Sequence, residues 1–321
     1  MMPPLIAAIE CVITTIASSL TVGILIFVFK GCRKAELKSS PIFWTLMMAD
    51  FFVALFHLPH AIFWGLFFFN AVDYNAKVDI WNSVITWLIQ TSVVFYDCCS
   101  VALLVQKTVI LLHPGKSNRL VTPASFVFIF SASILLSAAY VIAFDFIERQ
   151  PPTLIKDCFN TNCEVPRGHL STFVYLYVKV VYVLTDVLLG FFFLVLLHRR
   201  NIKSFSINFR WSVVFMKYLF LFHFFLVLIP FLIDLVILNT FHVNLGTWLG
   251  SYSRVLLTTE GFSCAAIYTT ILHKKKSSAG QVTVVERTVA FSTSQKLSGR
   301  SSPKPARSRP CQQHANQKRF I

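Results

Sequence analysis

The chain of 321 residues is too apolar and too poor in charge for a water-soluble globular protein. Hydrophobic residues make up 55% of it and charged residues only 13%, whereas soluble domains carry about a quarter charged residues. The formal net charge of +15 gathers in the loops and at the C-terminus, so we interpret it as a membrane-topology signal and not as a nucleic-acid-binding surface.

Seven apolar stretches follow one another along the chain, each longer than the roughly 20 residues that cross a hydrocarbon core. They predict an all-α membrane protein, a seven-transmembrane helix bundle, because lipid-exposed strands or coil would leave backbone amides without partners. The first stretch is longer than the apolar core of a cleavable signal peptide, so we interpret it as a retained helix. In chain order the predicted spans are 5–29, 42–69, 80–112, 121–147, 170–197, 211–238 and 247–272.

The loops between these spans differ in charge on the two sides of the predicted membrane. Counted over loops and tail, 21 Lys and Arg residues lie on the side of the C-terminus and 4 on the other side. Because cytoplasmic loops retain an excess of Lys and Arg, we predict that the N-terminus is outside and the C-terminus inside.

The last 49 residues have a different composition from the rest. Residues 1–272 form the predicted membrane domain, whereas 273–321 are rich in Ser, Lys and Arg and too poor in apolar residues to fold alone. This part is predicted to be a disordered cytosolic tail. Its basic clusters can rest on anionic lipid and its hydroxyls can be phosphorylated; a solvated tail without a specific role is the alternative.

Carboxyl groups inside the predicted spans are informative because each costs about 2.5–3.5 kcal/mol on insertion scales and needs a partner or water. Asp50, Asp97 and Glu260 lie in the second, third and seventh spans, and Asp186 lies in the fifth. In a compact bundle the first three are expected to converge on one hydrated polar pocket. The alternative is that each carboxyl group forms a separate hydrogen bond with a neighbouring helix.

Two cations lie about two helical turns below the predicted outer surface, Arg254 and Lys179. A cavity open to the outside would end at this depth, where a buried cation can hold an anionic ligand group. Pairing with Asp234 is the alternative.

Histidine and cysteine residues give weaker signals. His57 and His60 have the i, i+3 spacing of metal ligands, but without a third ligand we favour packing over a zinc site. Cys158 and Cys163 lie in an outside loop, where a disulfide and free thiols are both open. The sequence contains no phosphate-binding loop and no nucleophile motif. We therefore predict no metal, no cofactor and no enzymatic activity.

Several motifs resemble those of the rhodopsin-like G protein-coupled receptors. Residues 46–50, Leu-Met-Met-Ala-Asp, are similar to the second-helix pattern that ends in an acidic residue. Gln-Lys-Thr, centred on Lys107 and followed by Pro114, has the spacing of the Asp-Arg-Tyr triplet and its proline. Pro230 fits the kink proline of the sixth helix, and Tyr268 is the one residue kept from the Asn-Pro-x-x-Tyr motif of the seventh.

The departures from this pattern narrow the resemblance to a smaller group of receptors. Leu228 stands where a Trp is usual, the first helix lacks its Asn, and no Cys caps the outer end of the third helix. This erosion, the 33 Phe residues, the short N-terminus and the Cys pair before the fifth helix are similar to the nematode serpentine chemoreceptors of class xa or class bc. Vertebrate bitter taste receptors share the size, but their second-helix pattern fits less well.

The resemblance implies a chemosensory G protein-coupled receptor in the plasma membrane, for instance of sensory neurons or cilia. A small-molecule ligand would bind from outside, and a heterotrimeric G protein from inside, with arrestin and kinases acting at the tail. The expected ligand-pocket residues are Arg254, Lys179 and Asp234; the internal polar switch is Asp50, Asp97 and Glu260; and the G-protein contact is Lys107, Pro114, Arg199, Arg200 and Lys203.

Two other functions remain open for a seven-helix protein. A membrane enzyme would combine a metal with carboxylates, and a transporter or ligand-gated channel would show internal repeats or Gly- and Pro-broken spans. Neither of these patterns stands out in the sequence.

Overall fold

The computed structural model describes a set of helices and very little connecting chain. The described residues are 4–31, 40–69, 71–72, 76–113, 118–142, 169–199, 207–241 and 252–271, and no strand occurs in these ranges. The chain divides into two units, Met1–Leu272 and His273–Ile321, and everything described belongs to the first. The expected tail at 273–321 and the Cys158 and Cys163 pair therefore lie outside the described residues.

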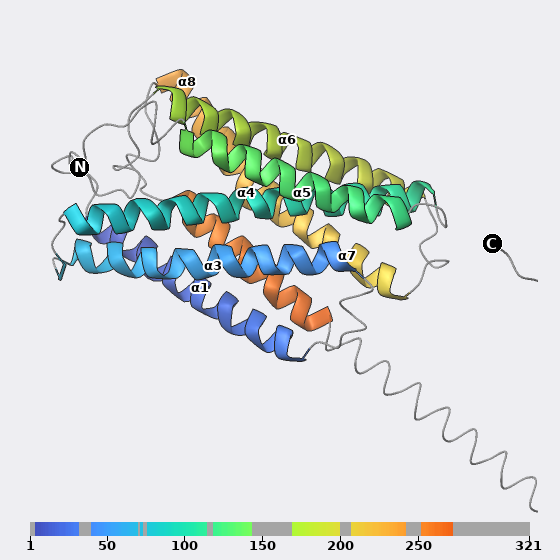
Figure 1. Cartoon of the computed structure of the whole chain (residues 1–321), viewed down its shortest axis with the longest axis horizontal. Coiled ribbons are helices and arrows are strands. Elements are labelled where there is room, and N and C mark those ends of the chain that lie inside the picture. The colour runs from blue at the N-terminus through green and yellow to red at the C-terminus, as the bar shows by residue number, and fades with distance from the viewer. Residues whose placement is uncertain are drawn as a thin grey trace, which may run out of the picture. The chain divides into compact units, whose positions relative to one another are not determined.

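The helices run roughly along one common direction (Figure 1). The segment 252–271 is also helical, and we refer to it as the last helix. In chain order the elements before it are α1 (Pro4–Gly31), α3 (Pro41–Phe68), α4 (Ala76–Leu112), α5 (Asn118–Val141), α6 (His169–Arg199), α7 (Ile207–Phe222), the π-helical segment η4 (His223–Leu228) and α8 (Ile229–Phe241).

Six of these helical stretches are long and apolar enough to cross a membrane: Ile6–Gly31, Pro41–Phe68, Ile80–Leu112, Val121–Ala139, Val180–Arg199 and Phe209–Ile233. The last helix is not among them, because it carries Arg254, Glu260 and six Ser or Thr residues within its 252–271 range. The expectation of an all-helical protein with several membrane-spanning helices agrees with this arrangement. The seventh span and the orientation stay predictions.

Helix α4 lies at the centre of the bundle. It packs against α3, α5 and α6, and 67% of its most apolar stretch is buried, compared with 17% for α5. This central position explains why α4 carries polar side chains, among them Tyr96, Ser100 and Gln106, that all face protein. A helix on the edge of the bundle would expose some of them to lipid.

The outer faces of the other helices are apolar and exposed. Val127 on α5, with Leu188 and Phe191 on α6, are 64–69% exposed. Such side chains are costly in water, but lipid tails are as apolar as leucine. These faces therefore suit a hydrocarbon environment.

One end of the bundle, where α1 ends and α3 begins, is held by an aromatic cluster. We define it as Phe43 and Trp44 of α3, Phe215 of α7 and Tyr268 of the last helix. The ring centroid of Phe43 lies 4.8 Å from that of Phe215 and 4.8 Å from that of Tyr268, and Trp44 meets Tyr268 edge-on at 6.0 Å. Edge-on and tilted rings attract each other beyond the area that they bury, so the cluster fixes α3, α7 and the last helix together.

The sixth apolar stretch contains a π-helical turn just before Pro230. A proline ring clashes with the carbonyl group four residues earlier and cannot donate a hydrogen bond. The wider π turn relieves this conflict, and Ile229 N–H accordingly bonds to Phe224 O, five residues back. The sequence assigned Pro230 to a kink, and the structure shows a change in helical winding that begins at His223.

Candidate functional site

A buried network of polar side chains crosses the middle of the bundle. It consists of Tyr96 and Ser100 on α4, Asp186 on α6, His223 at the start of η4 and Glu260 on the last helix. All five are at most 5% exposed. We call this set the polar network. Its members are separated by as many as 164 residues in the sequence, so only the packing of the helices brings them together.

One half of the network centres on Glu260. The Tyr96 hydroxyl donates to Glu260 Oε1 over 3.3 Å, and Nδ1 of His223 lies 3.2 Å from the same oxygen. Two helices thus direct polar groups at one oxygen of a carboxyl group that is fully buried.

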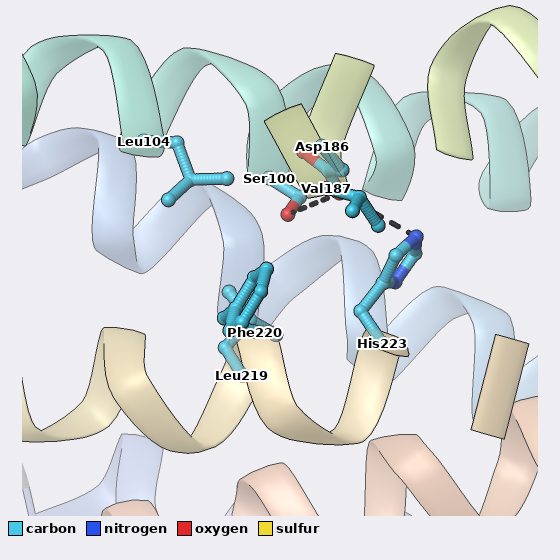
Figure 2. Close-up of a pocket in the computed structure, with 7 residues that line it drawn as sticks. All are labelled: Ser100, Leu104, Asp186, Val187, Leu219, Phe220 and His223. Atoms are coloured by element: carbon cyan, nitrogen blue, oxygen red, sulfur yellow. Dashed lines mark hydrogen bonds and ion pairs between the residues drawn. The ribbon is translucent and has the colours of Figure 1, made fainter. Parts of the chain in front are cut away.

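The other half centres on Asp186. The Ser100 hydroxyl donates to Asp186 Oδ2 over 2.9 Å, and Nε2 of His223 lies 3.6 Å from that oxygen. Figure 2 shows the His223 ring and the Ser100 hydroxyl approaching Asp186 from two different helices. A cavity of about 10 Å³ lies between these side chains and Leu219. A volume of this order is close to the least that holds one water molecule.

Three of the acids in this region have one buried oxygen without a hydrogen-bond partner. Among the described residues, Glu260 Oε2, Asp186 Oδ1 and Asp50 Oδ2 accept no hydrogen bond. A buried carboxylate oxygen without a partner is costly. Such an oxygen can accept a hydrogen bond from a water molecule, or the carboxyl group can bind a proton, which removes its negative charge.

Asp50 lies close to the network because residue 261, on the last helix, is a glycine and leaves room for the Asp50 carboxyl group. A Cβ atom at residue 261 would collide with Asp50 Oδ1. The glycine lets α3 approach the last helix at this level, and the Asp50 carboxyl group, which is 3% exposed, comes to lie next to the Glu260 position and interacts with it electrostatically.

The three residues of the predicted polar switch, Asp50, Asp97 and Glu260, all lie in the described part of the chain, and their role as a switch stays a prediction. The structure brings Asp50 and Glu260 together in the core, and Asp97 lies on α4 beside Tyr96, half-buried and interacting electrostatically with His223. The side chains that contact these acids, Tyr96, Ser100 and His223, were not evident from the sequence. The available clue was a histidine inside an apolar stretch, His223, about two helical turns before the helix-breaking Pro230.

A second polar contact joins α3 to the last helix nearer the other end of the bundle. Arg254 Nη1 lies 2.9 Å from His60 Nδ1, and Trp64 Nε1–H donates to His60 Nε2 over 3.1 Å. A neutral imidazole has only one acceptor nitrogen, so His60 accepts from one of the two donors at a time. The i, i+3 partner His57 bonds through Nδ1 to Val53 O of its own helix, 2.8 Å away.

The remaining ligand-pocket residues are placed only by their backbone. Lys179 lies in α6 and Asp234 in α8, and their side chains are outside the described part of the structure. The two alternatives for Arg254, an anionic ligand or pairing with Asp234, both stay open beside the contact with His60. Within the described ranges, no three His, Cys, Asp or Glu residues have an arrangement that could hold a metal ion.

The expected G-protein contact is described at two positions. Lys107 lies near the end of α4, only 6% exposed, with its Nζ 5.7 Å from the centre of the Phe209 ring of α7. Cation–π contact of this kind favours a desolvated ammonium group. Arg199 is exposed at the last residue of α6, whereas Pro114, Arg200 and Lys203 are outside the described residues.

Two comparisons by sequence, with protein-family models and with curated proteins, identify no relative of this chain. No protein-family model matches the chain, and no curated protein sequence is significantly similar to it.

Proposed function

We propose that this protein is a seven-helix chemosensory receptor that binds a small molecule from outside the cell and activates a heterotrimeric G protein. In this proposal the N-terminus is outside, the tail is cytosolic, and the last helix is the seventh span. The orientation derives from the 21 to 4 distribution of Lys and Arg over the two sides.

The burial pattern of the last helix supports its role as a span. Thr258, Gly261, Ala265 and Tyr268 are all buried and recur at helical spacing, and Glu260 is fully buried between them. Polar residues that face the bundle interior do not contact lipid, so a spanning helix tolerates them. The low mean hydropathy of the last helix then follows from its place inside the bundle, where polar side chains contact protein and not lipid.

The observation that carries the proposal is the polar network itself. A receptor needs two helical arrangements of similar free energy, and a ligand shifts the population between them by its differential affinity. Polar contacts that link α4, α6, η4 and the last helix are directional, so a small rotation of one helix breaks them. A π-helical turn at the same level adds an irregular segment of the type often found at functional sites.

Lys107 supplies the proposed link to the cytosolic partner. It is buried against Phe209 in the described arrangement, so it becomes accessible to a G protein only if α7 moves away from α4. This fits the general behaviour of a switch whose active form opens at one end.

The first experiment tests signalling. Cells that express the full chain and reporters for cAMP, cGMP and calcium are screened with small molecules, and the Lys107→Ala variant is compared with wild type on any active compound. We expect Lys107→Ala to lose at least about tenfold in signalling efficacy at equal surface expression, which is about 1.4 kcal/mol in coupling.

The matched control is Lys30→Ala, because Lys30 has the same side chain but is exposed at the end of α1. It should signal as wild type does. Unchanged signalling in Lys107→Ala would remove Lys107 from the mechanism, and ligand-evoked current or uptake without any G protein would favour a channel or transporter instead.

The second experiment tests topology. An epitope tag at the N-terminus should be accessible on intact cells, and a tag after residue 321 should be accessible only after permeabilisation. Both tags in one compartment would exclude seven spans and with them the receptor proposal.

A further inference from the structure

The two ring nitrogens of His223 both face carboxyl oxygens. Nδ1 lies 3.2 Å from Glu260 Oε1, and Nε2 lies 3.6 Å from Asp186 Oδ2. The two oxygens belong to different helices, the last helix and α6, while His223 itself begins the π-helical segment. One imidazole ring therefore bridges three elements of the bundle.

The protonation of the ring decides whether this bridge can exist. A neutral imidazole has one N–H donor and one bare nitrogen, whereas the imidazolium form donates from both nitrogens. If the ring were neutral, the bare nitrogen would point its lone pair at a carboxyl oxygen, which has only lone pairs unless it carries a proton. The imidazolium form makes both contacts favourable, since it donates a hydrogen bond to Glu260 Oε1 and places its positive charge at ion-pair distance from Asp186 Oδ2.

The charge around the ring favours the same form. Asp186 and Glu260 contact His223 directly, and Asp97 on α4 interacts with it electrostatically. Asp50 on α3, with Tyr96 on α4 and Cys264 on the last helix, are the further titratable groups around Glu260. Unpaired buried charges of one sign are costly, so a positive charge at His223 and protons on some of the carboxyl groups lower the net charge of the cluster.

The oxygens that accept no hydrogen bond mark where such protons can reside. On the two acids that contact His223, Asp186 Oδ1 and Glu260 Oε2 are buried and have no hydrogen-bond partner in the described part of the chain. The cavity beside Asp186, Ser100 and His223 has room for about one water molecule, through which a proton can move. The cluster thus has acceptors, a donor and a space for water.

We propose that Asp186, His223 and Glu260 form a buried proton-binding site in which the His223 imidazolium ties α6 to the last helix. When His223 loses its proton, one of its two carboxylate contacts is lost and the π-helical segment is released from α6 or from the last helix. The site makes the packing of these elements sensitive to pH in the absence of any ligand, and it stands independently of the receptor proposal.

The experiment uses the full-length protein in detergent micelles, with ¹⁵N-labelled histidine and no ligand. In wild type, we expect one of the nine histidine signals to keep both ring nitrogens protonated at mildly alkaline pH, where a free imidazole in water is neutral. This signal should be missing from His223→Gln and present in His57→Gln, which removes another buried histidine.

Thermal unfolding over a range of pH gives the second readout. The midpoint of wild type should fall as the pH rises through the deprotonation of His223, and His223→Gln should lose this dependence while His57→Gln keeps it. If His223→Gln does not fold, the double variant His223→Gln/Glu260→Gln, which removes the acid left unpaired, should be the more stable of the two. A wild-type spectrum in which every histidine is neutral at mildly alkaline pH would overturn the proposal.

Discussion

The aromatic cluster and the polar network both include the last helix, but they hold it by different physical interactions. Phe43, Trp44, Phe215 and Tyr268 join α3, α7 and the last helix through ring contacts at 4.8–6.4 Å. The polar network joins α4, α6, η4 and the last helix through hydrogen bonds and ion pairs at 2.9–3.6 Å. Ring packing tolerates small rotations, whereas the polar contacts require specific atoms to face each other.

Because of this difference, the two sets of contacts should respond differently to pH. The aromatic cluster stabilises one end whatever the protonation of the protein, because it carries no charge. The polar network contains carboxyl oxygens without partners and a histidine that faces two acids. Its stability therefore depends on protonation and on the exact positions of these atoms, whereas the stability of the aromatic cluster depends on packing.

The largest effect should follow from breaking the polar network at one partner. Glu260→Ala removes the acceptor of Tyr96 and of His223 Nδ1 and leaves the histidine paired only with Asp186. Removing one partner of a buried ion pair costs about 3–5 kcal/mol, measured as the free energy of unfolding in micelles. A loss below about 1 kcal/mol would mean that the contact does not stabilise the protein.

An effect of similar or slightly smaller size is expected from the aromatic cluster. Phe215→Ala should cost about 3–5 kcal/mol in the free energy of unfolding, because it leaves a cavity between α3 and α7, and this cost should be the same at every pH. The control is Phe191→Ala, which removes an equal side chain from an exposed position on α6. Equal losses for the two variants would contradict the assignment of Phe215 to the core.

A loss of stability of intermediate size is expected when the close contact between α3 and the last helix is crowded. Gly261→Ala places a Cβ atom against Asp50 Oδ1, and overpacking of this kind costs about 1–3 kcal/mol in unfolding free energy. Gly23→Ala is the control, because no atom lies within 4 Å of a Cβ there. It should be neutral or stabilising, since alanine is the better helix former by about 1 kcal/mol. The reverse order of the two variants would argue against this helix contact.

The smallest effect concerns a single hydroxyl group. Ser100→Ala removes the hydrogen bond to Asp186 and should cost about 1 kcal/mol in unfolding free energy. Ser131→Ala on α5 removes an exposed hydroxyl that bonds only within its own helix and should leave stability unchanged. If Ser100→Ala is also neutral, water in the adjacent cavity has replaced the hydroxyl group.

Much of the architecture was predictable because hydropathy is a local property. A stretch of some 20 apolar residues forms a helix in lipid wherever its neighbours lie, and the described helices fall on the predicted stretches. The sixth stretch was harder, since one apolar run became α7, η4 and α8. The proline explains the irregularity, but sequence alone does not distinguish a kink from a π-helical turn.

The site was predictable only in its acids. Buried charge in an apolar stretch is visible in the sequence, so Asp50, Asp97 and Glu260 were singled out, with Asp186 noted beside them. Their partners were not visible, because serine and tyrosine are common in helices and His223 lies 37 residues from Glu260. The contact between Arg254 and His60, which are 194 residues apart, was missed for the same reason.

The sequence by itself determined that the chain consists of long apolar helices, and it named the few ionisable residues that such helices carry at a cost. Only the tertiary structure decided which of these residues meet, because contact depends on how each helix is rotated and how closely its neighbours approach. Gly261 illustrates the point: the missing side chain is visible in the sequence, but its effect on Asp50 exists only when α3 packs against the last helix.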